Sequence, residues 1–228
     1  MTWVLDNLDL ILQLSVEHLR QCLIAILLGF VLSIPLGFLA WRFRLLRGTV
    51  VTITGLMYTI PSLALLFLLP AVFGYVAFSD LNLILALTLY AIALLVRSVV
   101  DGLNSVDEGV RGASTAMGFS GARRFFAVEL PLAGPVILAG LRVAAVSTIA
   151  LAPVGILVGV SNLGYLFTNG LQRRIIPEVL AGVVAVVILA LLIDLVLVVI
   201  GRVLMPWTRR TRRRPRAASS AVPAEANA

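Results

Sequence analysis

The chain has 228 residues, of which 61% are hydrophobic and only 13% are charged, and its mean hydropathy is +1.07. A sequence this apolar is not typical of a soluble domain, so the composition indicates an integral membrane protein. The net charge is +7, and all 18 basic residues are arginine. Without lysine the chain cannot form a phosphate-binding loop of the type G-x-x-x-x-G-K-[ST], so any ATP-driven step must use another subunit.

The single cysteine and the single histidine limit the chemistry further. Cys22 lies within an apolar run and His18 lies just before it, which excludes a disulfide framework and a Cys/His zinc cluster. We interpret Cys22 as a packing residue and His18 as a polar residue at the membrane interface. No paired carboxylates or nucleophile with a base stand at a suitable spacing, so we expect no catalytic residue, no metal and no cofactor.

Residues 1–20 are predicted to form an extracytoplasmic interfacial segment. They contain three acidic residues and no basic residue before Arg20, unlike the positive start of a cleavable signal peptide. The side of this helix that meets the membrane is expected to carry Trp3, Val4, Leu8, Ile11, Leu12 and Ser15.

Residues 21–205 are predicted to form the membrane domain, with five spanning helices. A span needs about 20 mostly apolar residues, and such runs occur at 22–41, about 50–72, 81–100, 135–158 and 179–204. The second run contains Pro61, Pro70 and Gly74, so we expect it to be broken in the middle. The predicted fold class is therefore all-α and polytopic.

The arginines predict the orientation of the chain, because positive residues are retained on the cytoplasmic side. With the amino terminus outside, fourteen arginines are cytoplasmic, three are outside and Arg142 lies in the membrane. The cytoplasmic set is Arg42, Arg44, Arg47, Arg97, Arg111, Arg123, Arg124, Arg202, Arg209, Arg210, Arg212, Arg213, Arg214 and Arg216; the outside set is Arg20, Arg173 and Arg174. Five spans then place the carboxyl terminus in the cytoplasm.

The last six of these arginines lie in residues 206–228, which we predict to be a disordered cytoplasmic tail. Nothing aromatic is interleaved with them beyond Trp207. A topology anchor that meets anionic lipid headgroups is therefore the favoured interpretation, and nucleic acid is not an expected partner.

The one long cytoplasmic loop, about residues 101–131, is predicted to form a helical hairpin. Its apolar positions recur at helical spacing at Val106, Val110, Ala113 and Met117. We expect Gly118 to end this helix and Gly121 to allow a turn before a second short helix at 122–128.

This loop resembles that of the permease subunits of ATP-binding-cassette (ABC) importers. Their motif is Glu-Ala-Ala, three residues, Gly, nine residues and Ile-x-Leu-Pro. The present chain has Gly112-Ala113-Ser114, three residues, Gly118, nine residues and Val128-Glu129-Leu130-Pro131.

Four segments in this order are similar to the osmoprotectant branch, which imports glycine betaine, choline and related quaternary amines. They are Thr59-Ile60-Pro61-Ser62-Leu63-Ala64-Leu65, Met117-Gly118, Val128-Glu129-Leu130-Pro131-Leu132 and Ala139-Gly140-Leu141-Arg142. The resemblance covers roughly residues 15–205. It implies the type I ABC importer fold and location in the cytoplasmic membrane. It also implies three partners: a cytoplasmic ABC ATPase dimer, a second permease subunit in a homo- or heterodimer, and an extracytoplasmic solute-binding protein.

The resemblance also implies which residues couple the loop to the ATPase. They are Gly112, Ala113, Ser114, Gly118, Phe119, Phe125, Phe126, Glu129, Leu130 and Pro131. The three phenylalanines are candidate anchors for the ATPase, and packing against the chain's own spans is the alternative. Arg123 and Arg124 are expected to be solvated or to face lipid.

Two departures from the family pattern stand out. Gly112 replaces the motif Glu, and the family's Gly-rich stretch after the fourth span, close to Gly-x-Gly-Gly-Leu-Gly, is Gly159-Val160-Ser161-Asn162-Leu163-Gly164 here. One hypothesis for Gly112 is that the chain is half of a heterodimer whose other subunit keeps the Glu. Full activity of a homodimer would exclude that hypothesis.

Within the spans, two groups are candidates for a role in transport. Tyr58, Thr59, Pro61 and Ser62 surround the expected break and are candidates for the translocation path, with a simple packing kink as the alternative. Arg142 and Asp194 are intramembrane charges at compatible depths. They are expected to form a structural ion pair, and a gating role is the alternative.

The leading hypothesis is thus the permease subunit of an ABC importer for glycine betaine, choline or proline. The nearest alternative is an importer of amino acids or another small organic solute. An ATP-independent transporter is disfavoured because no internally repeated halves are evident. A purely structural membrane protein would leave the long loop without a purpose.

Overall fold

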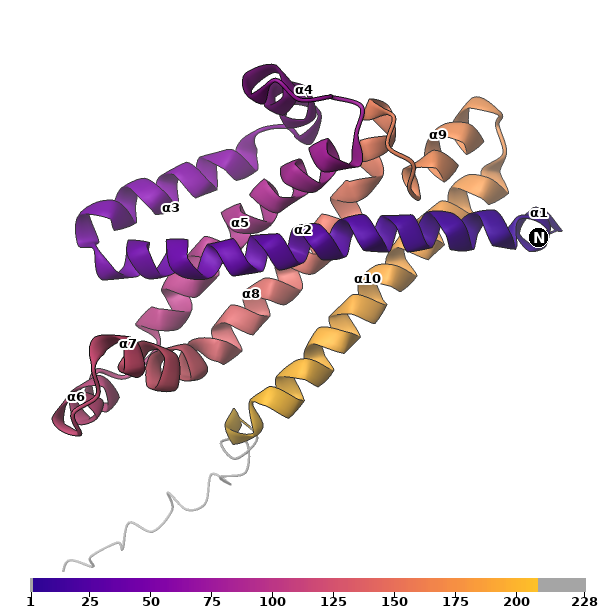
Figure 1. Ribbon diagram of the computed structural model, residues 1–228. Coiled ribbons are helices and arrows are strands. Elements are labelled where there is room, and N and C mark those ends of the chain that lie inside the picture. The colour runs from indigo at the N-terminus through magenta and orange to yellow at the C-terminus, as the bar shows by residue number, and fades with distance from the viewer. Residues whose placement is uncertain (1, 209–228) are drawn as a thin grey trace, which may run out of the picture.

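The structure, a computed structural model, describes residues 2–208, and the elements of this part of the chain are helical (Figure 1). The amino-terminal half contains α1 (Thr2–Asp6), α2 (Leu8–Arg42), α3 (Arg44–Thr59), α4 (Ser62–Phe73) and α5 (Asp80–Asn104). A hairpin follows, made of α6 (Glu108–Ala116), α7 (Gly121–Arg124) and the π-helical turn η1 (Phe125–Glu129). The rest consists of α8 (Leu130–Leu151), the 3₁₀ helix η2 (Ala152–Val158), α9 (Gly164–Gln172) and α10 (Ile176–Leu204).

Helix α2 has 35 residues, which at about 1.5 Å per residue make it roughly 52 Å long. It runs through the expected boundary at residues 20 and 21 without a break, so the predicted interfacial segment and the first span share one helix. No proline or glycine lies between Leu8 and Leu28 to interrupt the helix. The chain changes direction earlier, at Asn7, whose side-chain amide donates to the Trp3 carbonyl at 2.8 Å.

The expected break in the second apolar run is present at Ile60 and Pro61. Helices α3 and α4 meet there at an angle of 111°, because the proline has no N–H for the helical ladder and restricts the residue before it to extended geometry. Of the described residues, four helices are long and apolar enough to cross a membrane, and α3 with α4 makes a fifth if the bent pair is one span.

Helix α5 is central, since most of its residues are buried and it contacts α2, α3, α4 and α8. Small residues allow the close approach. A Cβ built on Gly29 of α2 would lie 2.5 Å from the Ala91 Cβ of α5, and one on Gly140 of α8 would lie 2.1 Å from the Ser98 Oγ. Glycine interfaces of this kind let helix backbones pack closely without a side chain between them.

Helices α8 and α10 complete the bundle, and α9 packs against the start of α10. Only Glu178, Gly182 and Gly201 of α10 are buried, so this helix exposes an apolar surface along its length. The α6/α7 hairpin and the last turn of α10 lie toward the same end of the molecule in Figure 1, away from α1 and α9. The six arginines of the predicted tail lie outside the described residues.

Candidate functional site

Helix α6 of the hairpin has a defined beginning and end. The Asp107 carboxylate caps its start by accepting from the backbone N–H groups of Gly109 at 2.7 Å and Val110 at 3.3 Å. At its end Gly118 has a φ of 81°, and the backbone N–H of Phe119 donates to the Ser114 carbonyl at 3.1 Å. This is a Schellman turn, which requires a left-handed residue at the position of Gly118. The prediction that Gly118 ends this helix is confirmed.

The three candidate anchor phenylalanines lie in different environments. Phe125 is buried, and its ring packs at 4.5 Å between centroids against Phe38 of α2. Phe125 therefore packs on the chain's own spans, which is the alternative to a role as an anchor for the ATPase. Phe126 is 67% exposed, and Phe119 is half-buried beneath the guanidinium of Arg123 at 4.5 Å.

The residues at the start of the loop motif divide between surface and interior. Gly112 and Ala113 are exposed on α6, whereas Ser114 is buried and donates to the Arg111 carbonyl at 2.8 Å. A Cβ at Gly112 would meet nothing within 4 Å. Leu130 and Pro131 are half-buried and begin α8, which continues directly from η1.

Glu129 is the buried charge of the hairpin. Its side chain is 1% exposed, and Oε1 accepts from the Arg124 Nε at 2.9 Å and lies 3.7 Å from the Arg111 Nε. The Arg124 guanidinium also donates to the Thr115 hydroxyl at 2.9 Å. Arg124 is thus an internal partner rather than a solvated or lipid-facing residue, which corrects the expectation from sequence.

The candidate path residues lie around the bend between α3 and α4. Tyr58, Thr59 and Pro61 are exposed, and Ser62 is half-buried. The Tyr58 ring meets that of Tyr90 edge to face at 5.9 Å, and the Tyr90 hydroxyl donates to the Ile60 carbonyl at the break. Tyr90 of α5 therefore satisfies a backbone group at the bend, as an interrupted helix at membrane depth requires.

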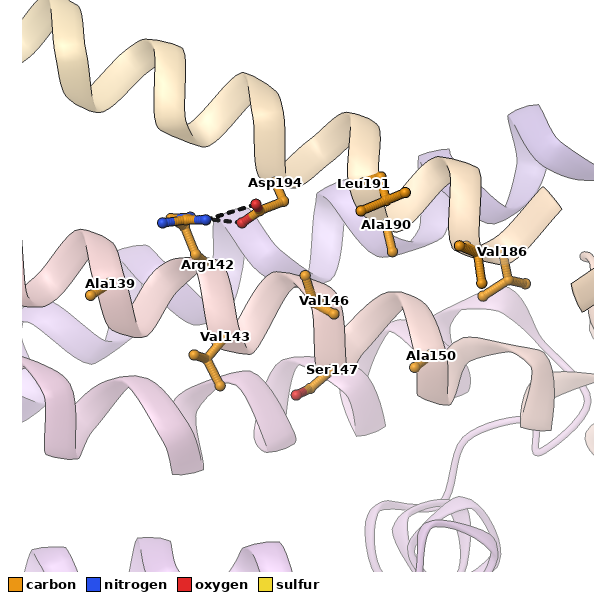
Figure 2. A pocket seen from close by; sticks show the side chains of 11 residues that line it. Ala139, Arg142, Val143, Val146, Ser147, Ala150, Val186, Ala190, Leu191 and Asp194 are labelled. Atoms are coloured by element: carbon orange, nitrogen blue, oxygen red, sulfur yellow. Dashed lines mark hydrogen bonds and ion pairs between the residues drawn. The ribbon is translucent and has the colours of Figure 1, made fainter. Parts of the chain in front are cut away.

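Arg142 and Asp194 form the predicted ion pair (Figure 2). The Arg142 Nε and Nη2 each donate to one carboxylate oxygen of Asp194 at 2.7 Å, a bidentate arrangement that joins α8 to α10. The pair lies in a groove of about 790 Å³ between these helices. Figure 2 shows Ala139, Val143 and Ala150 along the α8 side, and alanine and valine line most of the rest.

A polar cluster near the other end of the bundle, away from the hairpin, was not anticipated. The Asn162 amide donates to the Ala152 carbonyl at 2.9 Å and to the Gln21 Oε1 at 3.1 Å, and its Oδ1 accepts from the Gly164 N–H at 2.8 Å. His18 is fully buried beside the Ile149 carbonyl, 3.1 Å from Nε2, so its side chain faces the interior of the bundle. Two features of the sequence could have indicated this cluster: Asn162 within the Gly-rich stretch, and Gln21 directly before an apolar run.

Solved structures with the same fold define the class. A chain of the inward-facing MetNI methionine ABC transporter aligns with a TM-score of 0.76 at 24% identity, over 87% of this chain and 98% of that one. A chain of an amino acid ABC transporter solved with histidines aligns with a TM-score of 0.68 at 15% identity. The fold is therefore that of the type I ABC importer permeases.

Sequence comparisons give the family. Residues 25–210 match the model of the binding-protein-dependent transport system inner membrane component, and the chain belongs to this family of multi-pass cell-membrane proteins. The choline transport system permease protein OpuBB of Bacillus subtilis is 33% identical over 83% of this chain and 86% of its own length. The osmoprotectant import permease protein OsmW of Salmonella typhimurium is 32% identical over 90% of this chain and 96% of its own length. The glycine betaine/carnitine/choline permease protein OpuCD of B. subtilis is 34% identical over 92% and 90%.

Proposed function

We propose that the chain is the permease subunit of an ATP-driven importer that passes a compatible solute, such as glycine betaine, choline or proline, across the cytoplasmic membrane. The names of the relatives OpuBB, OsmW and OpuCD support glycine betaine and choline among these solutes. The expected partners are a cytoplasmic ATPase dimer, a second permease subunit and an extracytoplasmic binding protein. ATP hydrolysis belongs to the ATPase, since this chain has no lysine for a phosphate-binding loop.

The hairpin is the proposed contact with the ATPase, and its outer surface is the observation that carries this assignment. Val110 is 40% exposed, Met117 68% and Phe126 67%, although each is apolar. Exposed apolar side chains on a capped, rigid element are typical of a surface that docks a partner. Gly112 and Ala113 beside them leave room for close approach of the ATPase.

The bend at Pro61 is the proposed wall of the translocation path. Tyr58 is 44% exposed and presents an aromatic face, and a quaternary ammonium is attracted to such a face by cation–π interaction. Thr59 and Ser62 flank the bend with hydroxyl groups. Passage of the solute along this side of α3 and α4 is consistent with broken helices that line cavities in other transporters.

The proposed orientation has the amino terminus outside and the carboxyl terminus in the cytoplasm. The distribution of arginines favours it, with fourteen on the cytoplasmic side against three outside. It places the α6/α7 hairpin in the cytoplasm, where an ATPase is found.

The test is substrate-stimulated ATP hydrolysis in proteoliposomes that contain this chain, its partner ATPase and its partner binding protein. Glycine betaine, choline, proline and an unrelated amino acid are compared. Stimulation by the quaternary amines or proline supports the proposal. Stimulation only by the unrelated amino acid would keep the importer and discard the osmoprotectant assignment. Failure of the ATPase to associate would overturn the coupling role of the hairpin.

A further inference from the structure

We propose that Glu129 is the positioning residue that locks the hairpin onto the ends of the membrane helices, so that the hairpin and the spans move as one body. The inference rests on the proposed function, because a rigid connection matters if the hairpin transmits the motion of an ATPase. Glu129 directly precedes α8 and lies 17 positions after Gly112, the residue that replaces the motif Glu.

The Glu129 carboxylate is enclosed by the hairpin and the adjoining helices. The side chain is 1% exposed, and two guanidinium groups from different elements face it, Arg124 of α7 at 2.9 Å and Arg111 of α6 at 3.7 Å. A buried carboxylate is stable when cations and hydrogen bonds surround it, and removal of its charge leaves the two arginines facing each other. The cluster therefore favours one position of α6 relative to α8.

The two arginines that face Glu129 also contact other helices. Arg111 donates to the Leu103 carbonyl at the end of α5, and its guanidinium lies 5.0 Å from the centre of the Trp41 ring at the end of α2. Arg124 reaches back to Thr115 on α6 at 2.9 Å. Through these contacts Glu129 connects the hairpin to the ends of three long helices: α2, α5 and α8.

The backbone around Glu129 is a π-helical turn. Glu129 closes the π-helical turn η1, in which the Leu130 N–H donates to the Phe125 carbonyl. This wide turn buries both Phe125, against Phe38 of α2, and Glu129, against the arginines. π-Helical turns are rare and often mark functional positions.

The hairpin has both a buried charged cluster and exposed apolar residues. The cluster contacts Leu103 of α5 and Trp41 of α2 through Arg111, whereas the apolar residues Val110 and Met117 are exposed. Apart from the cluster, α6 is held by its chain connections at residues 105–107 and at the Gly118 turn and by the buried Ser114. Without the charge of Glu129 the hairpin is expected to pivot about these connections instead of carrying α8 with it.

The experiment compares Glu129→Gln with Glu108→Gln, a matched control that removes the same charge from an exposed position of the same hairpin. The first readout is the mobility of a nitroxide label at Met117→Cys, measured in nanodiscs on the permease alone. Cys22 is fully buried and leaves little background labelling. The second readout, with unlabelled protein and the full set of partners, is the number of solute molecules imported per ATP hydrolysed.

We expect Glu129→Gln to increase label mobility and to lower the import per ATP by about tenfold, with the ATPase still bound, whereas Glu108→Gln resembles the parent protein. Arg124→Lys, at a partly exposed position, keeps the charge but loses the forked geometry and is expected to change both readouts in the same direction. If Glu129→Gln does not fold, Arg124→Lys tests the inference in its place. Unchanged mobility and unchanged import per ATP in the recovered variant would overturn the inference. Because mobility is measured without partners, failure of the proposed function, seen as no import by the parent protein, is distinguished from failure of this one.

Discussion

Two glycines of the hairpin have opposite requirements, although both belong to the loop motif. Gly118 has a φ of 81°, in the left-handed region that side chains with a Cβ disfavour, whereas Gly112 lies within α6 with open space around it. The same substitution, glycine to alanine, is therefore expected to act in opposite directions at the two positions.

Gly112→Ala is expected to stabilise α6 by about 0.5–1 kcal/mol, because alanine loses less backbone entropy than glycine in a helix. Gly118→Ala is expected to destabilise the end of α6 by about 1–2 kcal/mol through backbone strain. Hydrogen exchange of the α6 amides in nanodiscs measures both. Faster exchange in Gly112→Ala, or no change in Gly118→Ala, would contradict the assigned backbone conformations.

The ion pair in the groove between α8 and α10 is expected to show strong non-additivity. Arg142→Leu or Asp194→Leu alone leaves an uncompensated charge at membrane depth, whereas the double substitution removes both charges. Each single variant is therefore expected to melt at a lower temperature than the double variant. Thermal melting of purified protein in detergent, followed by size-exclusion chromatography, measures this order.

Ser147→Ala is the control for the ion pair, because it changes the same groove without changing charge. It is expected to melt close to the parent protein. If the double variant loses as much stability as the two single variants added together, the two side chains act independently and the pair has no structural coupling.

The contact between helices α2 and α5 depends on the absence of side chains at two positions of α2. A Cβ at Gly29 would lie 2.5 Å from the Ala91 Cβ, and one at Gly37 would lie 2.6 Å from the Val99 Cβ. Ser33, between them, is buried and donates to the Gly29 carbonyl at 2.6 Å. Small residues four positions apart thus form the surface of α2 that meets the central helix.

Gly29→Ala is expected to destabilise the fold by about 1–3 kcal/mol, because the helices must separate to admit the methyl group. Gly48→Ala, on α3, where nothing lies within 4 Å of the added Cβ, is the matched control and is expected to be neutral or slightly stabilising. Adding Ala91→Gly to Gly29→Ala restores the clearance and is expected to recover part of the loss. Denaturation of the purified protein in mixed micelles measures these differences, and equal losses for Gly29→Ala and Gly48→Ala would contradict the close packing.

The number of membrane crossings depends on the bent pair of α3 and α4. If the pair crosses the membrane once, the chain has five spans and its ends lie on opposite sides. If the pair is re-entrant, the chain has four spans and its ends lie on the same side. The topology therefore depends on whether the pair bent by 111° at Pro61 crosses the membrane or returns to the same side.

Cysteine labelling with a membrane-impermeant maleimide distinguishes the two topologies. Leu5→Cys and Trp207→Cys introduce thiols at positions that are 68% and 44% exposed, and the native Cys22 is buried. In intact cells Leu5→Cys is expected to be labelled and Trp207→Cys is expected to be labelled only after the membrane is permeabilised. Labelling of both in intact cells would indicate a re-entrant pair.

Features that depend on local chemistry were predictable from the sequence. The lengths of the apolar runs predict the membrane helices, because a bilayer requires about 20 apolar residues per crossing. Pro61 predicts the break between α3 and α4, and Gly118 predicts the end of α6, because each restricts or permits backbone geometry at its own position. The spacing of the loop motif around Gly118 likewise identified the family without any knowledge of contacts.

The partners of the charged and polar side chains, in contrast, come from distant parts of the sequence and are known only from the packing of the helices. Nothing near Glu129 in the sequence shows that Arg111, 18 residues earlier, faces it, and nothing near His18 shows that the Ile149 carbonyl lies beside it. The same holds for Phe125, whose partner Phe38 belongs to another helix. The physical reason is that burial of a polar or aromatic group is decided by which helices pack together, and a helix presents a side chain to its neighbours only after the whole bundle has formed.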